Sequence, residues 1–171
     1  MKKTLLFALA LIAVGCADAE QSETLSEGSE QVAPSVSCAG IDTTWGDPLE
    51  DLLTCAKQGS AFHQFVLGEM YRNGEDVPED DAEAVRWYRL AAEQWSALSQ
   101  YQLGSMYSDG EGVPQDDVLA YMWWNLAAAN GHELAPLSKD LPEAVVLTRE
   151  QIAEAQRMSR EWMAEHPRGG N

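Results

Sequence analysis

The chain has 171 residues, of which 45% are apolar and six are tryptophan, and this composition predicts one globular domain with a modest core. Its formal net charge of -17 argues against a nucleic-acid partner, because phosphate backbones are bound with lysine and arginine. Such acidity gives solubility and favours basic partners.

The first residues have the pattern of a signal peptide. A short basic start, Met1 to Lys3, precedes an apolar stretch from Leu5 to Val14 that is too short to span a bilayer. We therefore expect residues 1–15 to be a signal peptide and the protein to be exported.

Two cleavage sites fit this signal peptide. The letters "AVGC", ending at Cys16, resemble a bacterial lipobox, whereas "ADA" at residues 17–19 suits ordinary signal peptidase. We favour lipidation of Cys16, and this resemblance, with Ala17 after the cysteine, implies an outer-membrane lipoprotein facing the periplasm. Cleavage after Ala19 would instead give a soluble periplasmic or secreted protein.

Residues 16–37 are rich in Ser, Glu and Gln and contain almost no large apolar side chains. Such a segment cannot bury enough surface to offset its ordering entropy. We expect a flexible tether that lets a folded domain stand off the membrane.

Cys38 and Cys55 remain when Cys16 is acylated. An exported compartment is oxidising, so this even pair is expected to form a disulfide that closes a loop of about 17 residues and stabilises by about 3 kcal/mol. Two free buried thiols, or a redox pair, are the alternatives, although the spacing is far from C-x-x-C.

The folded part begins with an internal repeat. Residues 60–95 align with residues 96–131 at a strict offset of 36, without gaps and with half of the positions identical. A period in the mid-thirties predicts one helical hairpin per repeat, because each hairpin buries its apolar side only when a neighbour stacks on it.

The local pattern predicts two helices in each repeat. A first helix runs from Ala61 to Asn73 and ends at Gly74, which suits the left-handed conformation after a helix. Pro78 prevents continuation, and Asp80 or Asp81 then caps a second helix that ends near residue 95.

The two segments "LGEMYRNGEDVPEDDAEAVRWYRLAA" and "LGSMYSDGEGVPQDDVLAYMWWNLAA" resemble Sel1-like repeats, which are relatives of tetratricopeptide repeats. The resemblance implies an all-α fold, a short solenoid of α/α helical hairpins forming a TPR-like superhelix. Three positions depart from the family pattern, namely Asp76 in place of a loop glycine, Trp95 in place of the terminal glycine and Trp124 in place of tyrosine.

The flanking segments are interpreted as caps. Residues 38–59 resemble the second helix of a degenerate preceding unit and are expected to form an N-terminal capping helix. Residues 132–171 are expected to contain a C-terminal capping helix that starts at a capping box of Thr148 and Gln151 and shields the last hairpin.

A candidate binding surface comes from the first helix of each repeat. At 100° per residue, the positions identical between repeats share one arc and the differing positions lie opposite. The resemblance places the differing arc on the concave side of the solenoid, where a protein or peptide would bind. The candidate residues are Phe62, Val66, Glu69, Leu98, Gln102 and Ser105. Simple drift on a solvated face is the alternative, and apolar Phe62, Val66 and Leu98 favour binding.

No cofactor, metal site or catalytic residue is expected. Some cysteine-rich relatives are described as penicillin-binding, so a cell-wall hydrolase or penicillin-binding activity is the rival function. The chain has no S-x-x-K nucleophile, and His63, His132 and His166 lie far apart without a zinc motif. The preferred hypothesis is a non-enzymatic binding module of the bacterial envelope, acting as an adaptor or assembly factor. Its expected partners are a protein or peptide and, through the lipid anchor, the membrane.

Overall fold

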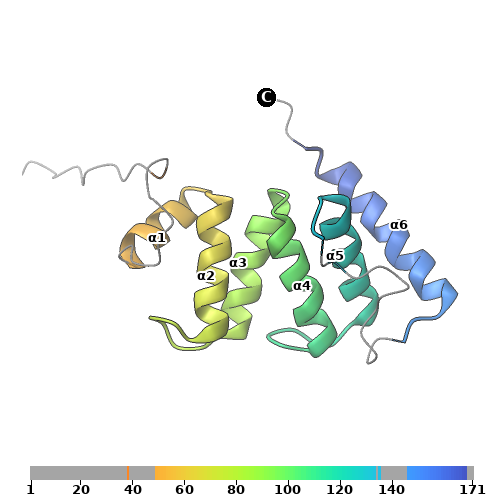
Figure 1. Cartoon of the computed structure of the whole chain (residues 1–171), viewed down its shortest axis with the longest axis horizontal. Coiled ribbons are helices and arrows are strands. Elements are labelled where there is room, and N and C mark those ends of the chain that lie inside the picture. The colour runs from red at the N-terminus through yellow and green to blue at the C-terminus, as the bar shows by residue number, and fades with distance from the viewer. Residues whose placement is uncertain (1–37, 39–48, 134, 136–145, 169–171) are drawn as a thin grey trace, which may run out of the picture. The chain divides into compact units, whose positions relative to one another are not determined.

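The computed structural model describes residues 38, 49–133, 135 and 146–168, and these form helices without any strand. The helices are α1 (Leu49–Lys57), α2 (Ala61–Asn73), α3 (Asp81–Glu93), α4 (Ala97–Asp109), α5 (Asp117–Ala129) and α6 (Arg149–Glu165) (Figure 1). The expected all-α fold is therefore confirmed. The signal peptide, Cys16 and the tether lie outside the described residues. Within the described part of the chain, no helix has the length and apolar character needed to cross a membrane.

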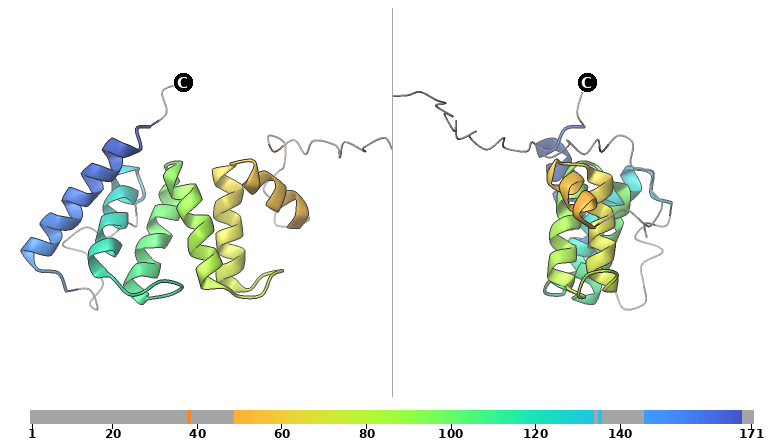
Figure 2. Two further views of the ribbon diagram at one scale, coloured as in Figure 1. Left: turned by 180° about the vertical axis from the view of Figure 1, so that it is seen from behind. Right: turned by 90° about the vertical axis from the view of Figure 1, so that its left-hand side faces the viewer.

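Two helical hairpins stack to form the body of the domain. Helices α2 and α3 form the first hairpin and α4 and α5 the second, while α1 packs on α2 and α6 packs on α5 (Figures 1 and 2). The loops inside both hairpins lie along the same edge, at the bottom of Figure 1. This is the expected hairpin solenoid, in which each helix packs mainly on its neighbours in the chain.

Side chains cap the helices where the sequence predicts it. Asp80 accepts a hydrogen bond from the backbone N–H of Glu83 at the start of α3, and Asp116 does the same for two backbone N–H groups of α5. Thr148 and Gln151 form the predicted capping box of α6. Each cap satisfies backbone donors that the first helical turn leaves unpaired.

The junctions between units repeat one hydrogen-bond pattern. The backbone N–H of Ser60 donates to the carbonyl of Cys55 at 3.1 Å, and Ser96 N–H donates to the Ala91 carbonyl at 3.1 Å. The buried Gln64 amide also donates to the Ala56 carbonyl at 3.0 Å. Gln100, identical in the repeat alignment, donates to the Ala92 carbonyl at 3.2 Å. Helix α1 therefore occupies the place of a second helix in a preceding unit.

Close helix packing depends on one glycine in each first helix. A Cβ atom on Gly68 would lie 2.4 Å from the ring of Tyr88, and one on Gly104 would lie 2.3 Å from the ring of Trp124. These rings are almost fully buried. A helical glycine costs about 1 kcal/mol relative to alanine. Here the absence of a Cβ atom lets an aromatic ring approach the helix backbone.

The core has a larger and a smaller cluster. The larger joins the two hairpins to Ala155 of α6, and it includes Tyr88, Leu103, Tyr121 and Trp123. The smaller lies under α1 and contains Leu52, Ala56, Leu67 and Met70, with Trp87 packed against it and partly buried. Trp87 and Trp123, which correspond to each other in the two repeats, therefore both contact the core. Of the two, only Trp123 is buried, because Trp162 of α6 covers it.

Trp95 ends the first repeat in the left-handed backbone conformation, with φ of 66°. Its counterpart in the second repeat, Gly131, has φ of 89°. Bulky residues rarely adopt positive φ. Here the indole N–H of Trp95 donates to the His166 carbonyl at 3.0 Å, and its ring meets Trp162 edge-on with centroids 5.2 Å apart. The Arg168 guanidinium lies 4.5 Å from the Trp95 ring centroid. Trp95, which replaces the glycine of the family pattern, therefore contacts residues at and after the end of α6.

The two cysteines expected to pair do so. Cys38 and Cys55 form a disulfide with 5.6 Å between their Cα atoms. Cys55 is fully buried on α1, so the bond ties the chain ahead of this helix to the start of the folded body.

Candidate functional site

The six candidate residues lie on two neighbouring first helices. We call them the first-helix surface, made of Phe62, Val66 and Glu69 on α2 with Leu98, Gln102 and Ser105 on α4. Phe62 is 46% exposed and Leu98 is 50% exposed, although both are large apolar side chains. The other four are half-buried. The exposed apolar groups therefore lie near the beginnings of the two helices, and the polar groups lie further along.

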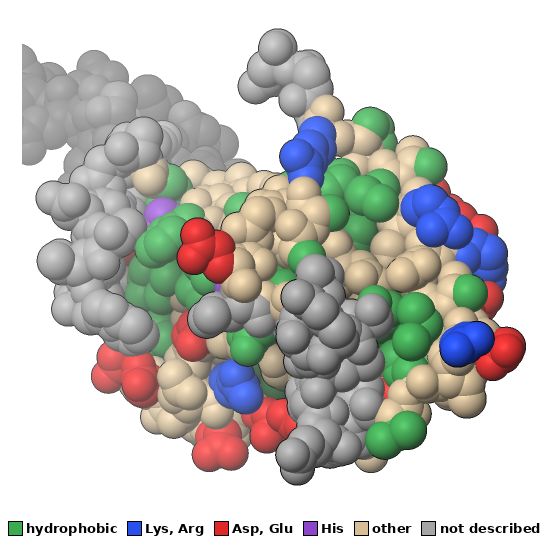
Figure 3. Space-filling model, turned by 45° about the vertical axis from the view of Figure 1, so that its right-hand side comes forward, with side chains coloured by type: hydrophobic (Ala, Val, Ile, Leu, Met, Phe, Trp, Pro, Cys, Tyr) green, Lys and Arg blue, Asp and Glu red, His purple; other side chains and the backbone are tan. Residues whose placement is uncertain are grey.

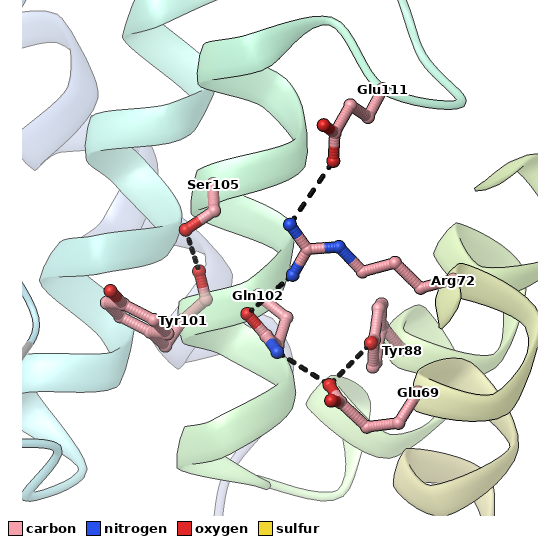
Figure 4. Close-up of polar contacts among 7 residues, drawn as sticks. All are labelled: Glu69, Arg72, Tyr88, Tyr101, Gln102, Ser105 and Glu111. Atoms are coloured by element: carbon pink, nitrogen blue, oxygen red, sulfur yellow. Dashed lines mark hydrogen bonds and ion pairs between the residues drawn. The ribbon is translucent and has the colours of Figure 1, made fainter.

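A hydrogen-bond network occupies the centre of this surface (Figure 4). The Glu69 carboxylate accepts from the Tyr88 hydroxyl at 2.6 Å and from the Gln102 amide at 2.6 Å, through the same oxygen. Arg72 donates to the Gln102 amide oxygen at 3.3 Å and pairs with the Glu111 carboxylate at 3.2 Å. The network connects α2, α3, α4 and the loop after α4, so it fixes one hairpin against the next.

Tyr88 acts as a neutral donor in this network. Burial raises the pKa of its hydroxyl far above the usual value, and the hydrogen bond to the Glu69 carboxylate raises it further. An ionised phenolate beside a carboxylate in a dry environment is unfavourable, so the proton stays on the oxygen. Tyr88 therefore orients Glu69 and is not poised for proton transfer.

The second repeat lacks this arrangement. Trp124 stands where Tyr88 stands in the first repeat, and Ser105 replaces Glu69. The Ser105 hydroxyl donates weakly to its own helix, at 3.4 Å from the Tyr101 carbonyl. Among the described residues, the buried Trp124 N–H has no hydrogen-bond partner. The Tyr101 ring stacks on His132 with centroids 4.4 Å apart. The two repeats therefore differ here, because Glu69 joins a charged hydrogen-bond network whereas Ser105 bonds only to its own helix.

Sequence reasoning identified Glu69 and Gln102 but missed the groups that bind them. Arg72 was on the differing arc of the helical wheel, three residues after Glu69, and that spacing is a signal for a shared site. The partners Tyr88 and Glu111 carry no local signal, since Glu111 is 39 residues from Arg72. Their contacts depend on how the hairpins stack.

Reactive groups do not converge in the described part of the chain. The three histidines occupy separate environments, with His63 bonded to Ser60, His132 stacked on Tyr101 and His166 stacked on Trp162. Among the described residues, no set of three or more His, Cys, Asp or Glu side chains could hold a metal ion. The first-helix surface presents exposed apolar groups beside a fixed polar network, which suits binding of a macromolecule.

Comparison with known proteins agrees with this geometry. Residues 64–94 and 97–132 match the Sel1 repeat family. The chain contains two Sel1 repeats. Sel1 repeat proteins are generally protein-interaction modules. The family resemblance drawn from the sequence is thus confirmed, whereas the lipoprotein character stays a prediction.

Two solved structures resemble this Sel1 repeat protein. A protective antigen present in uropathogenic Escherichia coli strains, which displays an SLR fold, is 31% identical with a TM-score of 0.62. The match covers 68% of this chain and 25% of that protein, so this chain spans a quarter of its length. A Sel1 repeat protein from Oxalobacter formigenes is 39% identical over 48% of this chain and 63% of its own, with a TM-score of 0.47. No protein with a curated description matches the chain.

Proposed function

We propose that this Sel1 repeat protein is a non-enzymatic binding module of the bacterial envelope and that it holds a protein or peptide segment on its first-helix surface. The observation that carries the proposal is the exposure of Phe62 and Leu98 at the same position of α2 and α4, the first helices of the two repeats. Side chains of this size at a half-exposed position gain free energy when a partner covers them, by roughly 1 kcal/mol each.

The hydrogen-bond network at the centre of the first-helix surface supports the same proposal. Glu69, Gln102 and Arg72 bridge the two hairpins, so the spacing between Phe62 and Leu98 is fixed before a partner arrives. A preorganised surface loses less conformational freedom on binding, and affinity rises accordingly. The polar groups also lie beside the apolar ones along the same two helices, and protein interfaces combine apolar and polar groups.

An envelope location is part of the proposal. The apolar stretch at residues 5–14 and the lipobox-like "AVGC" support export and lipidation of Cys16. The Cys38–Cys55 disulfide supports it independently, because disulfides persist in oxidising compartments. The proposed site of action is the periplasmic face of the outer membrane.

The binding surface is tested by crosslinking in intact envelopes, followed by capture of the tagged protein. The double variant Phe62→Ser/Leu98→Ser should lose a defined companion that the unaltered protein captures. A matched control is Leu90→Ser/Val146→Ser, because these side chains are also exposed, at 44% and 81%, but belong to neither α2 nor α4. Loss of the companion in the control alone, or in neither variant, would refute the assignment. Circular dichroism checks that every variant keeps its helices.

Lipidation is tested separately. Cys16→Ser should abolish incorporation of labelled palmitate and move the protein from the membrane fraction to the soluble fraction. A variant at Ala19 that blocks ordinary signal peptidase serves as the control and should leave labelling unchanged. Palmitate incorporation by Cys16→Ser would contradict the proposed anchor.

A further inference from the structure

The first-helix surface has an apolar end and an acidic end. Leu98 and Asp109 are eleven residues apart, so at 100° per residue they lie within about 20° of each other on α4. Phe62 and Asn73 have the same relation on α2, and Glu75 comes after Gly74, the C-cap of that helix. A rise of 1.5 Å per residue places the two ends about 16 Å apart. A single partner segment can therefore contact both.

Asp109 lacks a basic residue on its own helix that would compensate its charge. Asp109 is the last residue of α4, whose final turn contains no basic residue. The end of a helix already carries a partial negative charge, so an aspartate there is locally unfavourable. Its side chain is exposed. A positive charge from outside the chain would be attracted to the Asp109 carboxylate and to the negative end of the helix.

Glu75 lacks a partner that its counterpart has. In the repeat alignment Glu75 corresponds to Glu111, which pairs with Arg72 on the preceding first helix. The described residues before α2 form only α1, which corresponds to a second helix, and they contain no arginine that could pair with Glu75. Within the described residues Glu75 forms no ion pair, and it is exposed.

The arginines of the hairpins are already engaged. Residues 61–129 contain twelve Asp and Glu against three Arg. Arg72 pairs with Glu111, Arg86 pairs with Glu83, and Arg89 donates to the Tyr107 hydroxyl. Acidic side chains accordingly collect along the lower edge of the domain, where the loops inside the hairpins lie (Figure 3). The charge that this edge complements is positive.

From these observations we infer that the occupant of the first-helix surface is a basic segment of a partner protein. Apolar side chains of that segment pack on Phe62 and Leu98, and Lys or Arg side chains lie beside Glu75 and Asp109. An extended segment advances about 3.3 Å per residue, so the apolar and basic positions stand about five residues apart. This inference rests on the proposed function and specifies the chemistry of the partner.

The test uses a phage library of random twelve-residue peptides selected on the immobilised full chain, with affinities then measured by fluorescence anisotropy. Selected peptides should carry Lys or Arg about five positions from an apolar residue. The pair Glu75→Gln/Asp109→Asn should weaken them about fivefold, as two screened surface charge pairs would. The control pair Glu93→Gln/Glu150→Gln removes the same charge from exposed positions on α3 and α6 and should have little effect.

The possible outcomes distinguish failure of this inference from failure of the proposed binding function. Equal weakening by the two charge pairs would mean general acidity and no basic site, which overturns the inference. Peptides without basic residues that still require Phe62 and Leu98 would overturn it too, while leaving the proposed function intact. Selected peptides that bind Phe62→Ser/Leu98→Ser unchanged would overturn the proposed function itself.

Discussion

Replacing Gly112 with alanine should destabilise the protein more than any other single methyl group added to a loop inside a hairpin. Gly112 has φ of 67° in the loop between α4 and α5. A Cβ atom there would lie 2.3 Å from the carbonyl oxygen of Asp81 and 2.8 Å from the backbone nitrogen of Ala82. These are backbone atoms at the start of α3, so they cannot turn aside as a side chain could.

Two costs add in this variant. A non-glycine residue at positive φ costs roughly 1–2 kcal/mol, and overpacking against fixed atoms costs roughly 1–3 kcal/mol. The expected loss in the free energy of unfolding is therefore about 2–5 kcal/mol, or about 8–20 °C in Tm for a domain of this size.

Two comparisons isolate the packing cost. Gly110→Ala has a similar φ of 73°, but the nearest atom to its Cβ lies at 3.3 Å, so it should lose only about 1–2 kcal/mol. Asp76 occupies the position of Gly112 in the first repeat and already has φ of 58°, so Asp76→Gly should change stability by less than about 1 kcal/mol. Urea unfolding followed by circular dichroism measures all three. A Gly112→Ala variant no less stable than Gly110→Ala would refute the proposed contact between the two hairpins.

Three further predictions concern stability. Replacing the Cys38–Cys55 disulfide with Ser and Ala should lower the free energy of unfolding by about 3 kcal/mol, as judged by urea titration, and added reductant should have no further effect on that variant. Because the folded-state pKa of Tyr88 is raised above its unfolded value of about 10, its contribution is complete below that pH and is lost as pH rises above it. Thermal melts between about pH 8 and 11 should show a decline that Tyr88→Phe reduces, and equal slopes in both proteins would contradict this. Thr148→Ala removes the capping box of α6 and should cost about 1 kcal/mol, and a loss no larger than in an exposed mid-helix variant such as Gln156→Ala would argue against the cap.

The sequence predicted the fold because identical residues in the two repeats perform identical structural tasks. Gln64 and Gln100 make the same hydrogen bond to the preceding helix, and Gly68 and Gly104 admit an aromatic ring at the same place. Residues that are identical at a fixed offset can therefore be recognised as structural before their contacts are known. Capping could be inferred for the same reason, since Asp80 acts within one helical turn.

The candidate site was predictable only in part. Phe62 and Leu98 stood out as apolar residues on the side of the helix that stacking does not use, and they are exposed. The contacts of Glu69 and Gln102 could not be predicted, because they link residues 33 apart and depend on the distance and rotation between hairpins. Trp95 looked like a defect at a glycine position, and only the placement of α6 shows what its ring contacts.

The disulfide determines where mechanical load enters the domain. A pull on the chain ahead of Cys38 passes through the sulfur atoms to Cys55 and bypasses residues 39–54, so the first turns of α1 carry no tension. The load arrives at the junction that Ser60 and Gln64 hold with their hydrogen bonds to Cys55 and Ala56. Reduction of the disulfide would direct the same pull along the backbone. Helix α1 would then unwind from its beginning before the force reached the hairpins.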